Sequence, residues 1–373
     1  MKIHCNRETL ASAFQLAATV APARSPKEIL NNVKLSISGD QGVFTATDME
    51  VGIRVDVQDG LEIEAEGSVL LPVSRVVGIL RESTAEKITI ETTENDVLIS
   101  GGRSRFKLQG ANPDEFPRVV GFEEEAYHEI PTRLFREMIK RTVFATDSES
   151  SRYALGGVLL ELEGDTVIAV GTDGRRLARM QGTALSVGEH KTTGANTIVP
   201  SRAIQLMERA ASDDPEGEVC ICARANDVLM RTKRCTIYSR LVEGRYPNWR
   251  QVLPQRENVN QIDLTVGPLF AALRQAALVT AQDSRGIEFT FDDGTLRLEA
   301  NTAEIGQSVV EIPVAYDGNR VNLMMDHRFV AEFCKALDPE TNFLFELEDE
   351  KKPAMLSTED GYCYVIMPMS RDR

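Results

Sequence analysis

The chain has 373 residues, of which 42% are hydrophobic and 27% are charged, and its formal net charge at pH 7 is −15. This composition is typical of a soluble globular protein, and it argues against both a membrane span and a protein that grips nucleic acid over its whole surface. A local basic face remains compatible with the acidic net charge.

Taken in chain order, the predicted elements occur three times in the same succession. Each series begins with a short strand and an amphipathic helix, within 2–20, 128–145 and 262–280. A hairpin with a Gly/Asp turn follows, at 35–48, 159–173 and 288–302. A second helix comes next, at 72–83, 200–212 and 326–337. Each series closes with a strand pair that runs into a proline, at 97–117, 228–247 and 354–368.

A repeat of this length is a whole domain rather than a solenoid unit. We therefore predict three domains, 1–124, 125–257 and 258–373, divided at polar, linker-like segments. Each domain should have an α+β fold with two helices and about eight antiparallel strands, the helices gathered on one side of the sheets. Ser201 and Asp326 are the predicted N-caps of two second helices. Three tandem copies favour a ring or a scaffold over a single catalytic centre.

The predicted helices carry basic charge although the whole chain is acidic. On the first helix of the second copy, the face opposite the apolar stripe holds Arg133, Arg136, Lys140 and Arg141. The acidic residues concentrate in strands and loops instead. For any one helix a solvated surface explains such a face. Because most of the six helices are net basic, we favour a nucleic-acid track inside an acidic body.

No residue pattern in the sequence predicts catalysis, a cofactor or a metal site. The four histidines, His4, His128, His190 and His327, each stand without a second ligand at metal spacing. Phosphate-binding loops and nucleophile motifs are missing. The six cysteines contain no C-x-x-C pair, so we expect reduced, buried thiols and a cytoplasmic location.

Three acidic features could still suggest an active site. Asp292-Asp293 lies at a predicted hairpin turn, and turn chemistry explains it. Thr172-Asp173 recurs as Thr47-Asp48 in the first copy, which indicates a structural role. Asp213-Asp214 is an adjacent pair of acids that could suggest a metal site. Two alternatives therefore stay open: an enzyme that uses these acidic turns, and a repeat scaffold that binds peptides but not DNA. The basic helix faces argue against the second.

Four segments resemble a known family. They are "SSRYALGGVLLE" at 150–161, "VGTDGRRLA" at 170–178, "RLVEGRYPNWRQVLP" at 240–254 and "YVIMPM" at 364–369. With the threefold repeat, they make the whole chain similar to the bacterial sliding clamps, the beta subunits of the replicative DNA polymerase III holoenzyme. The resemblance implies a homodimeric ring around duplex DNA, with helices inside, sheets outside and no catalysis or cofactor. It also implies loading by an ATP-driven clamp loader and tethering of replicative and repair polymerases through a short apolar peptide.

The resemblance also implies three sets of site residues. The partner-peptide pocket between the second and third domains would comprise Leu155, Thr172, Gly174, Arg175, Arg176, Leu177, Pro247, Val252, Val365, Met367, Pro368 and Met369. Contacts to DNA would come from Arg24, Arg75, Arg136, Lys140, Arg152, Tyr153 and Arg202. The dimer interface would use Phe106, Leu108, Leu278 and Val279.

The chain departs from the family pattern at three of these places. Arg175 stands where many relatives have His, and Gln251 stands where some have Arg. These changes are expected to alter selectivity at the rim of the pocket rather than its apolar anchors. Ala154 follows Tyr153 where some relatives have a second Tyr, which weakens the assignment of a DNA contact there.

Overall fold

The structure is a computed structural model that describes residues 1–57, 60–93, 96–147, 153–192, 197–253, 259–281 and 284–369. The chain forms two compact units. Unit 1 comprises Met1–Arg133, Leu185–Lys191 and Gln205–Leu241, and unit 2 comprises Leu134–Ala184, Thr192–Ile204 and Val242–Arg373. Among the described residues, no helix is both long and apolar enough for a membrane span.

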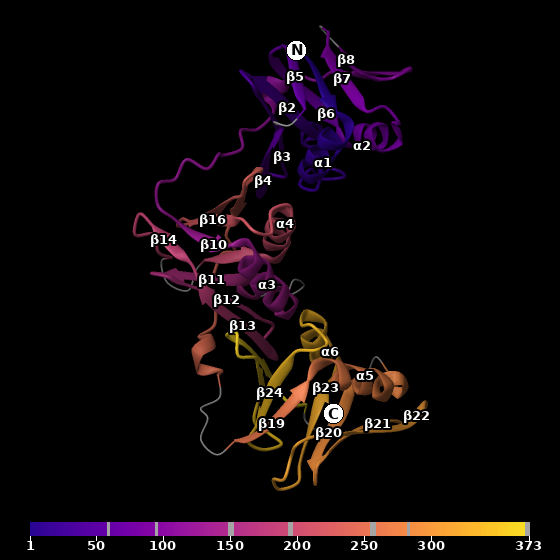
Figure 1. Ribbon diagram of the computed structural model, residues 1–373, viewed down its shortest axis with the longest axis vertical. Coiled ribbons are helices and arrows are strands. Elements are labelled where there is room, and N and C mark those ends of the chain that lie inside the picture. Colours follow the sequence, from indigo (N-terminus) through magenta and orange to yellow (C-terminus); the bar gives the residue numbers. More distant parts are fainter. Residues whose placement is uncertain are drawn as a thin grey trace. The chain divides into compact units, whose positions relative to one another are not determined.

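Each predicted repeat contributes two α-helices, which confirms the predicted helix content (Figure 1). They are α1 (Arg7–Ala18), α2 (Val73–Glu82), α3 (Thr132–Thr142), α4 (Ser201–Ala211), α5 (Val266–Ala276) and α6 (His327–Ala336). Asp326 caps α6 as predicted, because its side chain accepts from the Arg328 N–H. The prediction for Ser201 is wrong. Ser201 is the first residue inside α4, and its hydroxyl donates to the Gly156 carbonyl at 2.9 Å.

Unit 1 contains two antiparallel sheets, ordered β5-β1-β7-β8-β9 and β14-β10-β16-β17-β18-β4-β3-β2-β6. The first consists of β1 (Lys2–Asn6), β5 (Leu61–Ala65), β7 (Lys87–Thr92), β8 (Asp96–Gly101) and β9 (Ser104–Gln109). The second consists of β2 (Asn32–Ser38), β3 (Gln41–Thr47), β4 (Val51–Val57), β6 (Gly67–Pro72), β10 (Tyr127–Pro131), β14 (Leu185–Val187), β16 (Glu218–Ala223), β17 (Asp227–Arg231) and β18 (Cys235–Arg240). Helix α1 packs on the second sheet, where Phe14 meets Phe44 edge to face.

Unit 2 also contains two antiparallel sheets, ordered β15-β11-β12-β13-β26-β25-β24-β19 and β22-β21-β20-β23. The first consists of β11 (Gly157–Glu163), β12 (Thr166–Thr172), β13 (Arg176–Thr183), β15 (Ile198–Pro200), β19 (Asn260–Thr265), β24 (Asn342–Leu347), β25 (Ala354–Ser357) and β26 (Tyr362–Ile366). The second consists of β20 (Gly286–Asp292), β21 (Thr295–Thr302), β22 (Gly306–Pro313) and β23 (Val321–Asp326). Phe333 of α6 stacks on Tyr364 of β26, so α6 covers one face of the eight-stranded sheet.

The three hairpin turns predicted from Gly/Asp pairs are present. Gly39 and Gly164 take φ values of 56° and 54° between β2 and β3 and between β11 and β12. In the third copy Asp293 and Gly294 have φ values of 40° and 73° between β20 and β21. Positive φ at both central residues is the geometry of a two-residue hairpin turn. The Asp292-Asp293 pair is therefore explained by the turn.

The Thr-Asp pairs build the same turn twice, as predicted. Thr172 Oγ1 donates to the Arg176 carbonyl at 2.6 Å, and Asp173 Oδ1 accepts from the Arg176 N–H at 3.0 Å. In the first copy Thr47 Oγ1 donates to the Val51 carbonyl at 2.8 Å, and the Asp48 carboxylate accepts from the Val51 N–H at 2.7 Å. These side-chain bonds replace backbone bonds that the turn cannot make.

Neighbouring repeats are joined by strand pairing. The last strand of the second copy, β18, pairs with β4 of the first, and the last strand of the third copy, β26, pairs with β13 of the second. Strands β4, β13 and β22 hold the same place in their copies, as do β9, β18 and β26. Because the sheets run through the repeats, the compact units do not coincide with the predicted domains, whose boundaries stay a prediction.

Two buried histidines face each other in unit 1. The Nδ1 atoms of His128 and His190 lie 2.7 Å apart, and 0% and 8% of these residues is exposed. One Nδ1 must carry the proton that the other accepts, so the ring that accepts is neutral. Burial lowers the pKa of His190, and His128 lowers it further, against the opposing effects of the Ala223 backbone and Glu124. A proton on the accepting Nδ1 would set two N–H groups against each other.

We therefore expect acid to loosen the β14 edge. Unfolded His takes up a proton near pH 6.5, whereas the folded pKa of His190 lies lower. Below pH 6.5 the unfolded segment therefore binds more protons than the folded one. The free energy of unfolding of this edge falls as the pH falls through that range, by at most about 1.4 kcal/mol per pH unit. Amide exchange at 185–190, corrected for its intrinsic pH dependence, should accelerate between pH 7 and 5.5. His190→Gln should lose this acceleration. Equal pH dependence in both proteins would contradict the expectation.

Candidate functional site

The candidate site lies on the face of the eight-stranded sheet where residues 242–253 pack against strands β11, β12, β13 and β26. Tyr246 and Trp249 of this segment are buried, and they join an apolar cluster with Leu159, Val170, Leu177, Ile198, Met355 and Val365. The Tyr246 hydroxyl donates to the Val170 carbonyl at 3.0 Å. Trp249 Nε1 and Arg250 both donate to the Glu161 carboxylate, at 3.2 Å for Trp249. These bonds hold the crossing segment in place over the sheet.

The structure brings the apolar centre of the predicted pocket together. Leu177 of β13 pairs with Val365 of β26, and Thr172 pairs with Leu177 across β12 and β13. The Met367 N–H donates to the Arg175 carbonyl at 2.9 Å, so the chain after β26 runs beside the Thr172–Arg176 turn. The floor is buried, because Leu177 and Val365 are 2% and 1% exposed. Leu155, which lies in the 3₁₀ helix Tyr153–Leu155, is also buried.

The edges of this surface are open. Val252, Met367 and Met369 have 41%, 41% and 36% of their surface exposed, although all three are apolar. Gly174, Arg175 and Pro247 are exposed as well, and Pro368 is half-buried. The Met369 N–H donates to the Met324 carbonyl at 2.7 Å, which fixes the backbone there, while the residue stays partly exposed. An apolar floor with flexible methionines at its rim suits several related apolar ligands.

The side chain of one predicted pocket residue points elsewhere. Arg176 is 8% exposed, and its guanidinium donates to Asp173, to Glu332 of α6 and to the Phe144 carbonyl. It also lies 4.4 Å from the centre of the Phe329 ring. Burial disfavours the charged form, but Tyr364 and Glu332 outweigh it, and the pKa of Arg176 lies above its ordinary value. The guanidinium therefore makes its contacts on the face of the sheet that α6 covers, rather than in the pocket.

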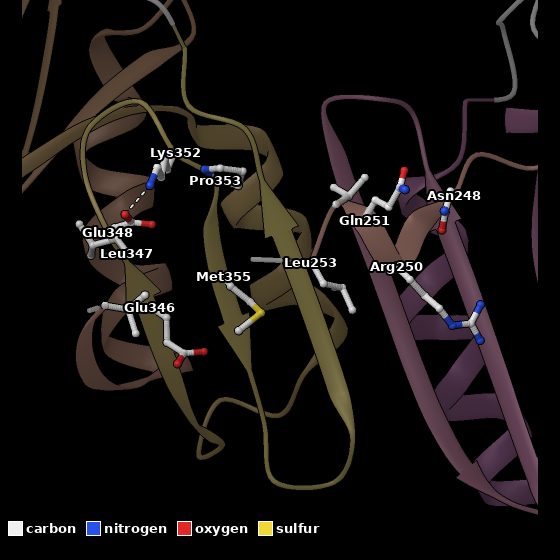
Figure 2. A pocket seen from close by; sticks show the side chains of 12 residues that line it. Asn248, Arg250, Gln251, Leu253, Glu346, Leu347, Glu348, Lys352, Pro353 and Met355 are labelled. Carbon is white, nitrogen blue, oxygen red and sulfur yellow. Dashed lines mark hydrogen bonds and ion pairs between the residues drawn. The ribbon is translucent and has the colours of Figure 1, made fainter. Parts of the chain in front are cut away.

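A cavity of about 700 Å³ adjoins the pocket, on the side of β24 and β25 (Figure 2). Leu253 and Met355 are among the side chains that line it, and Figure 2 shows the Lys352–Glu348 ion pair beside them. The cavity shares Val252 with the predicted set, and Met355 pairs with Val365 of the pocket floor. Sequence reasoning missed Leu253, Met355 and the β24–β25 hairpin. Their apolar residues gave no local signal that distinguishes a site from a core.

The predicted DNA-contact residues are distributed over the helices and one loop. Arg75 of α2, Lys140 of α3 and Arg202 of α4 are exposed, as is Arg24, which follows α1. Arg136 of α3 is half-buried. Arg152 lies outside the described residues, and Tyr153 is described only by its backbone. Exposed cations on helices are the groups that would contact phosphates without reading bases.

The predicted dimer residues lie at two sheet edges. Phe106 and Leu108 belong to β9, which the described part of the chain pairs on one side only, with β8. Phe106 is 39% exposed. Leu278 and Val279 lie in the 3₁₀ helix Ala277–Val279, beside the edge strand β22, and Leu278 is 79% exposed. Within the described residues no cluster of three or more His, Cys, Asp or Glu side chains could hold a metal ion.

Comparison with known proteins shows similarity along the whole chain. Residues 1–120, 129–248 and 250–370 match the N-terminal, central and C-terminal domains of the DNA polymerase III beta subunit. The beta sliding clamp of Pseudomonas putida is 31% identical over 376 residues, covering 99% of this chain and all of that one. That of Chlamydia pneumoniae is 28% identical, covering 99% of each chain. The crystal structure of the Pseudomonas aeruginosa sliding clamp bound to griselimycin superposes with a TM-score of 0.91, at 29% identity and 99% coverage of both chains.

Proposed function

The chain belongs to the beta subunit family of bacterial DNA polymerase III, the beta sliding clamps, and we propose that it works as a closed homodimeric ring. In this proposal the ring encircles duplex DNA, slides without sequence preference and tethers replicative and repair polymerases through the pocket on β13 and β26. It has no catalysis of its own, and a clamp loader opens it. A ring holds DNA topologically, so its direct contacts can stay weak.

The observation that carries the ring is the repeated way in which copies join. Inside the chain a last strand, β18 or β26, twice pairs with a third strand, β4 or β13. The last strand of the first copy, β9, and the third strand of the third copy, β22, have no such partner among the described residues and are edge strands. An exposed edge of this kind is a template for another strand. We propose that β9 of each subunit pairs with β22 of the other. Two chains then close a ring of six equivalent junctions, two inside each chain and two between the chains.

The internal junctions also predict the register of this seam. Ile237 pairs with Ile53 at the first junction, and Tyr364 pairs with Ala178 at the second. All four of these residues are fully buried. By their places in the hairpins, Phe106 corresponds to Ile237 and Tyr364, and Ser308 corresponds to Ile53 and Ala178. Phe106 should therefore lie opposite Ser308 of the partner chain and become buried.

Charge supports the same pairing. The segment 103–107 carries Arg103, Arg105 and Lys107, and the segment 304–311 carries Glu304 and Glu311. Antiparallel pairing of Phe106 with Ser308 brings Arg103 opposite Glu311. Opposite charges across two strands stabilise them, and they disfavour the pairing of either edge with itself.

The ring is tested by retention on DNA. The clamp, loaded by its clamp loader onto nicked circular DNA, should stay bound through gel filtration and should leave within minutes when one restriction cut linearises the circle. Retention on the linear form would contradict a sliding ring and favour tight local binding. No loading at all, with a solution mass of 41.3 kDa, would contradict the dimer.

We expect direct DNA contact to be weak and to depend on salt. Arg24, Arg75 and Arg202 are exposed cations, so each would contact phosphates and release counterions. Neutralising one of them, as in Arg75→Gln, should flatten the slope of log K against log salt by roughly one unit without altering sequence preference. Fluorescence anisotropy with two unrelated duplexes measures both quantities. A sequence-specific footprint from the purified protein would count against this proposal.

For the pocket, griselimycin on the Pseudomonas aeruginosa clamp supports a ligand site in the same family. In this chain the buried Leu177 and Val365 form an apolar floor, and the exposed Met367 and Met369 form its rim. We propose that the partners of this site present a short flexible peptide with a Leu and a Phe, or equivalents, as anchors. Calorimetric titration with griselimycin and with such a peptide tests the site, and each should compete with the other.

A further inference from the structure

The pocket is built from two repeats, and buried arginines join them. Arg176 is the last residue of the Thr172–Arg176 turn in the second copy, and its guanidinium donates to Glu332 of α6 in the third copy. Arg141 of α3 reaches Asp360, between β25 and β26, at 2.5 Å, and its guanidinium lies 5.5 Å from the centre of the Tyr362 ring. Both arginines are less than a tenth exposed, so the prediction that Arg141 belongs to the basic surface of α3 is wrong. Each arginine therefore links the second copy to the third on the face of the eight-stranded sheet that is opposite the pocket.

The turn itself does not require an arginine. In the first copy Val51 takes the place of Arg176, and it makes the same bonds to Thr47 and Asp48. Val51 is also buried. A buried charge is costly unless it is fully paired, so a role beyond the turn must favour an arginine here. The contacts that Val51 cannot make are those to Glu332, Phe144 and Phe329.

Resting on the peptide-binding function proposed above, we propose that Arg176 is a positioning residue that sets partner affinity from the helix side of the sheet. Its guanidinium donates to Asp173 at 3.1 Å and to Glu332 at the same time, so it links the turn to α6. The turn in turn holds the rim, because the Arg175 carbonyl accepts from the Met367 N–H at 2.9 Å. Arg176 thereby keeps the two halves of the pocket at one separation without touching the ligand through its guanidinium.

The test compares the two arginines. Arg176→Met should weaken griselimycin and peptide binding by about tenfold or more, since a site whose support loosens loses its productive geometry. Arg141→Met removes a buried tie at the same junction and should lower the melting temperature by a similar amount, with an affinity change below about threefold. Glu332→Gln should weaken binding less than Arg176→Met, and it should add nothing in the Arg176→Met background, because the two residues act as one unit.

Affinity within threefold of the wild type for Arg176→Met would overturn the inference, as would an equal loss in Arg141→Met. A second readout needs no ligand. The Met367 amide should exchange about tenfold faster in Arg176→Met than in the wild type or Arg141→Met, because its acceptor sits on the released turn. Unchanged exchange would overturn the inference. If the wild type binds neither probe, the proposed pocket fails, and the exchange result alone decides the role of Arg176.

Discussion

A chain carrying Leu278→Lys and Val279→Lys is expected to change from twice 41.3 kDa to 41.3 kDa in light scattering. Leu278 is 79% exposed beside β22, and the proposed seam would bury it near the partner's Phe106. Apolar anchors at the centre of an interface carry most of its energy, and two lysines there would each be desolvated without a partner.

The chain offers a matched control for this variant. Leu185 is 56% exposed on β14, an edge strand that has no part in the proposed seam. Leu185→Lys should leave the dimer mass unchanged, so it separates the seam from a general effect of surface charge. An unchanged mass in the double lysine variant would place the interface elsewhere.

A crosslink tests the register of the seam directly. Phe106→Cys with Ser308→Cys should form a disulfide between subunits under mild oxidation, because directly opposed residues bring their Cβ atoms within reach. Arg105→Cys with Ser308→Cys should not, since a shift of one residue moves the side chain to the other face of the sheet. Equal crosslinking of both pairs would contradict the register.

Replacing both rim methionines, Met367→Ala with Met369→Ala, is expected to weaken binding of a Leu/Phe peptide by roughly thirtyfold or more. Losing a buried anchor contact typically costs about 2 kcal/mol or more, and each 1.4 kcal/mol is about tenfold in affinity. Both side chains are partly exposed in the free chain, so a ligand can cover them. Calorimetric titration measures the loss, and the dimer mass should not change.

Three single substitutions control for the pocket variant. Arg175→Ala and Gln251→Ala should shift affinity far less, because polar rim groups mainly tune selectivity and association rate. Met49→Ala removes a methionine that is 42% exposed but lies in unit 1, and it should leave affinity unchanged. Equal affinity for the wild type and the double methionine variant would remove the pocket assignment.

Local rules in the sequence determined the elements of this protein. Apolar periodicity placed the six helices, and the Gly/Asp pairs placed the three hairpin turns. Repetition of Thr47-Asp48 as Thr172-Asp173 identified a structural turn, and the Asp326 cap followed from its position before a helix. These features depend on hydrogen bonds and side-chain faces within a few residues, so a single sequence contains them.

Only the tertiary structure decided how these elements combine. The pairing of β18 with β4 and of β26 with β13 joins segments far apart in the chain, as do the contacts of His128 with His190 and of Arg176 with Glu332. The same apolar strand pattern fits a core, a junction or the wall of a cavity, as Met355 shows. Which of these forms depends on how distant surfaces exclude water from one another, and no local pattern in the sequence encodes that choice.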